Sequence, residues 1–167
     1  MTDFAAVRRR AWWYAALGAL AVAILGGLAT EIGPWYRALA KPSWNPPDWL
    51  FGPAWTLIYA LTALAGVEAW QAARERPQRR MLALLFIING CLNVLWSLLF
   101  FRLRRPDWAL FEVGALWLSI VSLLYYCGRL HRRSVALLLP YLLWVSFAAV
   151  LNASVVSLNA PFGAAAQ

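Results

Sequence analysis

The chain has 167 residues, of which 63% are hydrophobic and only 13% are charged. Soluble domains contain about 45–50% apolar and about 25% charged residues, so this composition excludes an ordinary water-soluble domain. The net charge of +8 does not indicate nucleic-acid binding, because the arginines lie between long apolar stretches and no groove-reading motif accompanies them.

The first apolar stretch covers residues 11–30 and follows a cluster of arginines. A helix needs about 20 apolar residues to cross the hydrocarbon core of a bilayer, and this stretch is long enough. A cleavable signal peptide has a shorter apolar run and a small-residue cleavage site. We therefore expect a retained transmembrane helix here.

The next segment, residues 31–48, is rich in proline, tryptophan and tyrosine. Proline fixes φ and removes a backbone donor, so the segment should be stiff without being helical throughout. Anchoring at the membrane interface explains two or three of its aromatic residues. A packed lid across one end of the bundle explains all of them, and we favour the lid.

Four further apolar stretches follow, at residues 49–73, 81–101, 108–128 and 134–157. Their connections are short and basic, which is typical of antiparallel neighbours in a bundle. The sequence therefore predicts an all-α integral membrane protein with a bundle of five transmembrane helices. We expect one domain over residues 1–159 and a C-terminal tail over residues 160–167.

The basic residues are divided unequally between the two sides of the predicted bundle. Ten of the fifteen lysines and arginines fall on the side of the N-terminus. Because cytoplasmic loops carry the excess of basic residues, this predicts a cytoplasmic N-terminus. The prediction assumes a multi-pass protein of a bacterial membrane, which is the localisation we expect.

Amide and aromatic side chains recur at helical spacing inside the predicted helices. They are Trp55 and Tyr59, then Asn89, Asn93 and Trp96, then Trp108 and Glu112, and finally Tyr141, Trp144, Ala148 and Asn152. Amides in hydrocarbon need partners, so these faces should point inward. Hydrogen bonds between helices are one interpretation. A pocket for a large, flat, mostly apolar ligand, lined by Trp55, Trp96 and Trp144, is the other.

Small residues recur at every fourth position in two helices: Ala15, Ala19 and Ala23, and Ala65, Ala69 and Ala73. Such spacing allows helices to approach closely within one chain or across a dimer, and the pattern does not decide between the two. Cys91 and Cys127 fall inside apolar spans and are expected to be small buried residues.

Conventional catalytic motifs are absent from the sequence, which has no Walker loop, no GxSxG and no paired carboxylates within the spans. The single histidine, His131, lies in a basic loop. Glu68 and Glu112 lie near helix ends, where interfacial carboxylates are the simpler interpretation. We expect no metal site and no covalent cofactor.

Several of these residues together resemble a known family. The first loop reads Trp35-Tyr36, Leu39, Lys41-Pro42-Ser43-Trp44-Asn45-Pro46-Pro47-Asp48-Trp49, then Pro53-Ala54-Trp55 and Tyr59. The later helices carry Asn93, Trp96 and Phe100-Phe101, then Trp108-Ala109-Leu110 with Glu112, then Pro140-Tyr141-Leu142, Trp144, Phe147-Ala148 and Val150-Leu151-Asn152. The pattern resembles the TspO/MBR family, whose members are called tryptophan-rich sensory proteins in bacteria and translocator protein in animals.

The resemblance implies a five-helix bundle whose ligand pocket is capped by the first loop. Family members bind porphyrins, notably protoporphyrin IX, as well as sterols and isoquinoline- or benzodiazepine-type ligands, and are often homodimers. The expected partners are thus a porphyrin, as the ligand, and the lipid bilayer, in which the chain is embedded. The implied ligand-binding residues are Trp35, Trp44, Trp55, Tyr59, Asn93, Trp96, Trp108, Glu112, Tyr141, Trp144, Ala148 and Asn152.

Two departures from the family pattern stand out. The stretch after Leu151 lacks the tyrosine and the basic residue of the animal cholesterol motif, so specific sterol recognition is not expected from it. Ser97-Leu98 stands where relatives carry a proline after the third-helix tryptophan, and its absence should straighten that helix.

The resemblance leaves three functional hypotheses. The first is a membrane receptor, sensor or carrier that binds porphyrins and is linked to the regulation of tetrapyrrole metabolism. The alternative is a light-dependent porphyrin-degrading enzyme, in which Trp55 and Trp144 match the two tryptophans that act in some bacterial members. A structural module with incidental ligand binding is the third.

Overall fold

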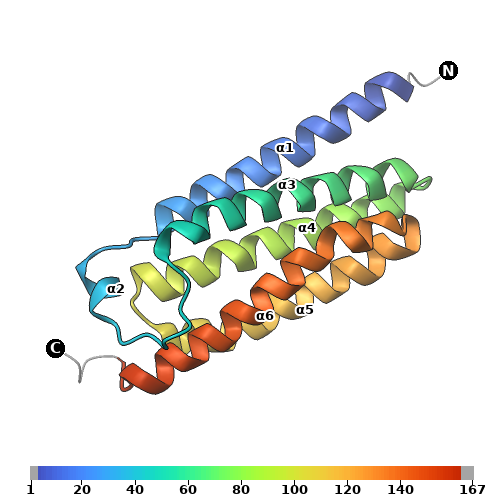
Figure 1. The fold of residues 1–167 in the computed structure, drawn as a ribbon. Coiled ribbons are helices and arrows are strands. Elements are labelled where there is room, and N and C mark those ends of the chain that lie inside the picture. The colour runs from blue at the N-terminus through green and yellow to red at the C-terminus, as the bar shows by residue number, and fades with distance from the viewer. Residues whose placement is uncertain (1–3, 163–167) are drawn as a thin grey trace.

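The structure is a computed structural model that describes residues 4–162. Five long helices form the bundle: α1 (Phe4–Ala29), α3 (Asp48–Ala72), α4 (Arg76–Ser97), α5 (Pro106–Leu130) and α6 (Arg133–Asn159) (Figure 1). Each contains a segment long and apolar enough to cross a membrane. The predicted all-α fold with five transmembrane helices is confirmed. Two of the helices, α1 and α4, begin at Phe4 and Arg76, ahead of the spans predicted from residues 11 and 81. Residues 163–167 of the predicted tail lie outside the described residues.

Local sequence explains where several of these helices begin. Pro106 is the first residue of α5, where its missing N–H and fixed φ cost nothing. At the start of α4, Gln78 Oε1 accepts hydrogen bonds from the backbone N–H groups of Arg74 at 2.9 Å and Glu75 at 3.2 Å. This reciprocal cap closes the short basic connection between α3 and α4.

The long helices pack as antiparallel neighbours, with α5 against both α4 and α6 and with α3 against α6 (Figure 1). The first helix packs at the edge of the bundle, against α3 and α4. Many of its large side chains are exposed, among them Trp13 and Leu28. In a membrane these side chains contact lipid, so α1 is the helix with the least support from the rest of the chain.

The small residues of α3 lie inside the bundle. Ala65, Ala69 and Ala73 are almost fully buried in one core cluster with Leu123 of α5 and Leu138 of α6. The close approach is tight enough for the Ser134 hydroxyl of α6 to donate to the Ala65 carbonyl of α3 at 3.2 Å. These three alanines, which we call the α3 stripe, therefore serve packing within the chain.

The end of α4 differs from the expected straight helix. The chain passes into a π-helical turn, η1 (Leu98–Arg102), in which the Leu103 N–H bonds to the Leu98 carbonyl at 2.9 Å. Arg104 then adopts a positive φ of 52°. The absence of proline thus does not give a regular α-helix, because the wider turn and the left-handed residue bring the chain round to the start of α5.

The first loop, with the short helix α2 (Pro34–Ala38), lies across the end of the bundle where α3 begins and α6 ends (Figure 1). The Lys41 ammonium donates to the Tyr36 carbonyl at 2.8 Å and lies over the Tyr36 ring. The Tyr36 hydroxyl donates to Asp48 Oδ1 at 3.4 Å. Asn159 at the end of α6 bonds both backbone groups of Ala40 at 2.8 Å.

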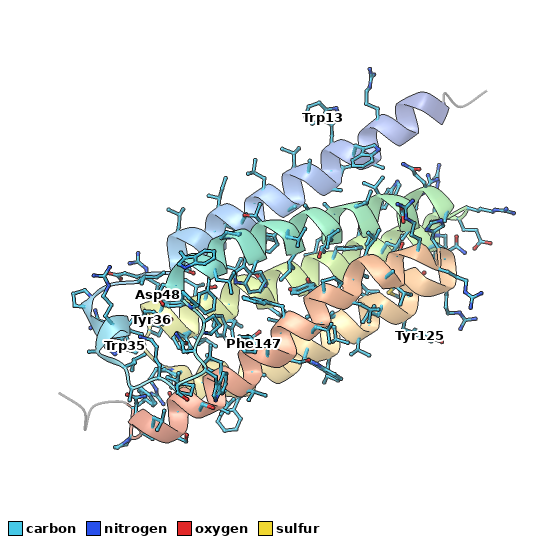
Figure 2. The ribbon with its side chains drawn as sticks, in the orientation of Figure 1. Trp13, Trp35, Tyr36, Asp48, Tyr125 and Phe147 are labelled. Carbon is cyan, nitrogen blue, oxygen red and sulfur yellow. The ribbon has the colours of Figure 1, made fainter. Side chains whose placement is uncertain are left out.

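Aromatic side chains fasten the loop to the bundle below it. Trp44 meets Phe147 of α6, Trp35 meets Phe100 of η1, and Tyr36 meets Phe101 of η1, with ring centroids 5.8, 6.2 and 5.5 Å apart. Figure 2 shows Trp35, Tyr36 and Asp48 together at this end of the molecule. The loop is therefore a packed cover over one end of the bundle and not a loose tether.

Candidate ligand-binding site

A chain of polar side chains crosses the middle of the bundle. The Tyr59 hydroxyl of α3 donates to Asn93 Oδ1 of α4 at 2.8 Å, and Asn93 Nδ2 donates to the Tyr141 hydroxyl of α6 at 3.2 Å. Tyr141 donates to Asn89 Oδ1 at 3.2 Å, and Asn89 Nδ2 donates to Ser119 Oγ of α5 at 2.8 Å. These bonds join four helices, so the inward orientation predicted for the amides is confirmed. We call these five residues the polar ladder.

An aromatic cluster continues from the ladder toward the loop. Trp55 stacks on Tyr59 with ring centroids 5.3 Å apart, and it meets Tyr141 and Trp144 edge-on at 6.1 and 6.4 Å. Trp144 also contacts Phe147, which contacts Trp44 of the loop. Predicted site residues of α3, α6 and the loop are thus in contact through their rings. Their spacing on separate helices could predict a shared inward face but not these pairings.

A second aromatic cluster lies between α4, η1 and the loop. Trp96 stacks on Phe100 at 5.1 Å and meets Phe101 edge-on at 6.1 Å. Trp35 approaches Phe100 from the loop. The indole N–H of Trp96 is buried and has no hydrogen-bond partner in the part of the chain that the structure describes. This donor is therefore free to bond a polar group of a ligand.

Two further predicted residues carry buried polar atoms without partners. Both carboxyl oxygens of Glu112 on α5 are buried and unpartnered among the described residues. Asn152 on α6 donates from Nδ2 to the Pro106 carbonyl at 3.0 Å, but its Oδ1 is also buried without a partner. Glu112 therefore does not fit the interpretation of an interfacial carboxylate. Buried polar atoms cost free energy unless they are paired, so each of these atoms is a candidate to bond a polar group of a ligand.

The remaining predicted residues lie at the rim of this region. Trp108 is half-exposed, with the guanidinium of Arg105 4.1 Å from the centre of its ring. Arg105 is itself paired with Asp107. Ala148 is partly buried on α6 next to Phe147. It lines neither of the cavities described below.

A cavity of about 780 Å³ lies between α1, α3 and α4. Its walls are apolar, and small residues of α1 and α4 such as Ala15, Ala19 and Gly90 are among the lining residues. Tyr59, Asn89 and Tyr141 of the polar ladder form the inner wall. Of the predicted ligand-binding residues, Tyr59 and Tyr141 line this cavity. Trp55, Trp96 and Trp144 are not among its lining residues and lie beyond the ladder or under the loop.

The cavity wall also contains residues that the sequence alone did not single out. Thr62 of α3 carries a buried hydroxyl without a partner among the described residues, and Cys91 of α4 is exposed. The prediction that Cys91 is buried is wrong, because its side of α4 faces the groove beside α1. Only the spacing of small residues in α1 pointed to this wall.

Comparison with known proteins decides the family. The family model described as TspO/MBR family matches residues 15–158 of this chain. The chain belongs to the TspO/MBR family. It is 37% identical to the tryptophan-rich protein TspO of Chlorobaculum tepidum over 84% of this chain and 90% of the relative.

Further relatives are similar over comparable lengths. The chain is 39% identical to the tryptophan-rich protein TspO of Archaeoglobus fulgidus over 86% of this chain and 94% of the relative. It is 33% identical to the translocator protein of Sus scrofa over 84% and 87% of the two chains. With five candidate spans, this TspO/MBR protein is a multi-pass integral membrane protein.

Proposed function

We propose that this TspO/MBR-family protein is a membrane receptor, sensor or carrier for a large, flat, mostly apolar ligand of the porphyrin class. The observation that carries the proposal is the 780 Å³ cavity with Tyr59 and Tyr141 on its inner wall. Small-molecule sites occupy about 300–1,000 Å³ and are mostly apolar with a few placed polar groups. This cavity has both properties.

The ladder prepares the inner wall for the face of an aromatic ligand. Tyr59 cannot rotate freely, because its hydroxyl is held by Asn93 at 2.8 Å and its ring is stacked on Trp55 at 5.3 Å. A fixed ring on the wall binds a flat ligand without losing side-chain freedom at the moment of binding. The unpartnered hydroxyl of Thr62 is the first candidate to bond a polar group on the ligand.

The covered end of the bundle supplies the second part of the site. Trp96 Nε1, the Glu112 carboxyl group and Asn152 Oδ1 are buried without partners there. A ligand that entered between α1 and α4 would contact the ladder first. Polar substituents carried past the ladder would find these groups under the loop. A membrane-embedded receptor that takes its ligand laterally from the bilayer fits this order of contacts.

The experiment that tests the site uses the thiol of Cys91 as a reporter, because it lies on the cavity wall while Cys127 is fully buried. Protoporphyrin IX should slow the reaction of Cys91 with a membrane-permeant maleimide and should quench tryptophan fluorescence saturably. Ala19→Phe fills the cavity from α1 and should weaken binding by about tenfold or more. Ala16→Phe, on the exposed side of the same helix, is the matched control and should bind normally.

Two results would overturn the cavity as the binding site. One is equal affinity in Ala19→Phe and Ala16→Phe, combined with loss of binding in Trp144→Phe, which would move the ligand under the loop. The other is quenching without any protection of Cys91. An absence of saturable binding by either measurement would reject the porphyrin-class ligand itself.

Light-dependent degradation of the bound porphyrin is a second candidate function. The favouring observation is the run of touching rings from Tyr59 through Trp55 to Trp144. An excited porphyrin can accept one electron from such a ring, which leaves an indole radical cation, and dioxygen can then add to the porphyrin radical anion. The new C–O bond gives a peroxyl radical anion and interrupts the conjugation of the macrocycle. Illumination of the complex in air should then bleach the porphyrin faster than in a Trp55→Phe, Trp144→Phe variant with equal occupancy. Equal bleaching rates would reject the degradation and would leave the receptor function as the one proposal.

A further inference from the structure

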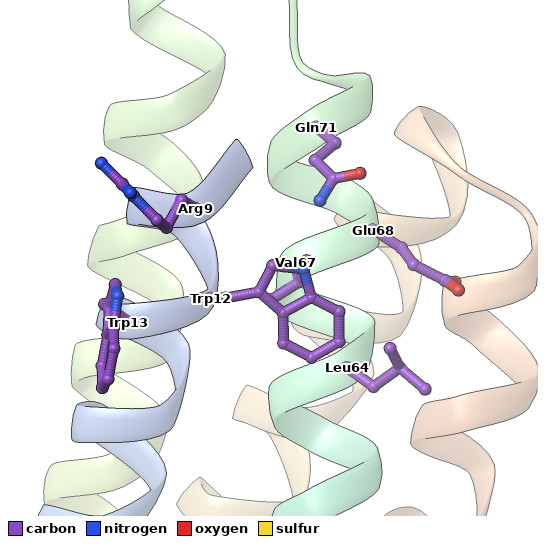
Figure 3. Close-up of a pocket in the computed structure, with 7 residues that line it drawn as sticks. All are labelled: Arg9, Trp12, Trp13, Leu64, Val67, Glu68 and Gln71. Atoms are coloured by element: carbon purple, nitrogen blue, oxygen red, sulfur yellow. The ribbon is translucent and has the colours of Figure 1, made fainter. Parts of the chain in front are cut away.

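A second cavity lies at the opposite end of the bundle from the loop, between α1 and α3. It has a volume of about 750 Å³ and is lined by Arg9, Trp12, Trp13, Leu64, Val67, Glu68 and Gln71 (Figure 3). None of these residues lines the cavity beside the polar ladder. It is therefore a separate site from the one proposed above.

The cavity lies at the depth of the lipid head groups. The apolar span of α1 begins at Ala11, and Arg9 precedes it by two residues. The span of α3 ends at Ala72, directly after Gln71. Leu64 and Val67 lie one to two turns deeper in α3 (Figure 3). The wall is thus polar at the membrane surface and apolar toward the hydrocarbon, which is the order of groups in a phospholipid.

Two tryptophans form the outer boundary of the cavity. Trp12 lies between α1 and α3 beside Val67, and Trp13 lies farther out on α1 (Figure 3). They are 49% and 63% exposed. Tryptophan prefers this interfacial depth because its ring is apolar and its N–H is polar. Such rings form a suitable surface for the first carbons of an acyl chain.

The one acidic residue of the cavity is already neutralised. Glu68 extends away from Trp12 toward α6 (Figure 3). Its Oε1 lies 3.4 Å from Nη1 of Arg133, and its Oε2 lies 3.3 Å from Nδ1 of His131. Among the described residues that line the cavity, the charge without an acidic partner is therefore the guanidinium of Arg9.

The surroundings add to the positive potential. The described charged residues at this end comprise eight arginines and two glutamates: Arg9, Arg74, Arg76, Arg79, Arg80, Arg129, Arg132 and Arg133, with Glu68 and Glu75. Basic residues near a membrane surface attract anionic lipids, and the attraction of several such residues adds up. A zwitterionic head group gains little from this field.

We propose that this cavity is a binding site for one anionic phospholipid. The Arg9 guanidinium pairs with the phosphodiester oxygens, since its planar fork matches their geometry. The Gln71 amide donates a further hydrogen bond to the head group. The acyl chain lies over Leu64, Val67 and Trp12. By filling the space between the weakly supported helix α1 and α3, the lipid holds α1 against the bundle.

The test measures lipid retained by the full-length protein in native mass spectrometry. The purified protein is equilibrated in detergent with equimolar phosphatidylglycerol and phosphatidylcholine that have identical acyl chains. Wild-type protein should retain one phosphatidylglycerol in preference to phosphatidylcholine. Arg9→Gln should lower that preference about fivefold, and Arg9→Lys should restore part of it. Arg132→Gln removes one exposed arginine from the same end and is the charge-matched control.

Three results would overturn the site. Equal retention of the two lipids by wild-type protein would show that the cavity does not select for the charge of the head group. An equal effect of Arg9→Gln and Arg132→Gln would show a diffuse surface charge in place of a site. Displacement of the phosphatidylglycerol by inorganic phosphate would show a free-anion site. The first of these results is measured on wild-type protein alone, so it can be obtained even if a variant fails to fold.

Discussion

Asn159, the last residue of α6, bonds both the N–H and the carbonyl of Ala40, 119 residues earlier in the chain, each at 2.8 Å. The same amide also donates to the Val155 carbonyl of its own helix at 2.8 Å. One side chain thus fixes the backbone of the first loop to the rigid end of α6. Without it, the loop would be held there mainly by aromatic contacts.

Replacement of Asn159 should loosen the loop without unfolding the bundle. Asn159→Ala removes two loop hydrogen bonds, each worth about 1 kcal/mol. We expect hydrogen exchange at the Ala40 amide to accelerate about fivefold or more. Ser157→Ala, which removes only a bond within α6, is the control. Unchanged exchange at Ala40 in Asn159→Ala would show that the aromatic contacts alone hold the loop.

The loop should also respond to high pH through Tyr36. Burial, with the nearby charge of Asp48 and the hydrogen bond to it, raises the pKa of Tyr36 from 10.0 to about 12. Because the folded loop favours the neutral phenol, its stabilisation is complete below pH 10 and is lost as the pH rises through 12. Partial access of solvent screens this effect, so the stabilisation at stake is on the order of 1 kcal/mol.

Ultraviolet difference absorbance between wild-type protein and Tyr36→Phe follows the tyrosinate of this residue alone. Asp48→Asn should lower the pKa of Tyr36 only in part, since burial is the larger cause. A Tyr36 that titrates near 10.0 in the wild-type protein would contradict the buried position of its ring.

The polar ladder should show coupling between Tyr59 and Asn93. Asn93→Leu leaves the buried Tyr59 hydroxyl without its acceptor and should destabilise the bundle by about 1–2 kcal/mol. Adding Tyr59→Phe removes the unpaired donor. The double variant should therefore lose less unfolding free energy than the sum of the losses in the two single variants. Unfolding of the reconstituted protein by a denaturing detergent measures all four members of the cycle. Additive losses would mean that the bond contributes nothing.

The α3 stripe should not tolerate larger side chains. Ala69 is fully buried against α5 and α6, so Ala69→Leu overpacks the core and should cost about 1–3 kcal/mol. Ala60→Leu makes the same change on the exposed side of α3 and should be nearly neutral. Similar unfolding curves for the two variants would contradict the packing role of the stripe.

The charge distribution predicts the orientation of the chain in a bacterial membrane. With ten of fifteen basic residues on the N-terminal side, that side should be cytoplasmic. An alkaline phosphatase reporter should then be active when it is fused after Gln167 and inactive when it is inserted after Arg74. The reverse pattern of activity would place the N-terminus outside.

The sequence predicts the transmembrane spans better than it predicts the contacts between distant residues. The five spans and the inward faces were predictable, because the transfer of each residue into hydrocarbon has a cost that depends on that residue alone. The loop was also predictable, since its prolines and aromatic residues restrict it locally. Helical spacing also correctly predicted that four side chains point into the bundle: Trp55, Tyr59, Asn93 and Tyr141.

Contacts between residues far apart in sequence were decided by tertiary structure. The pairing of Asn159 with Ala40 and of Glu68 with His131 and Arg133 depends on which helix ends meet. The position of the larger cavity depends on how α1 rests against α4, because the small residues of both helices leave the space between them. The sequence by itself thus determined what each helix turns inward. The fold alone decided which inward groups touch and where they leave room for a ligand, because packing is a property of pairs of surfaces.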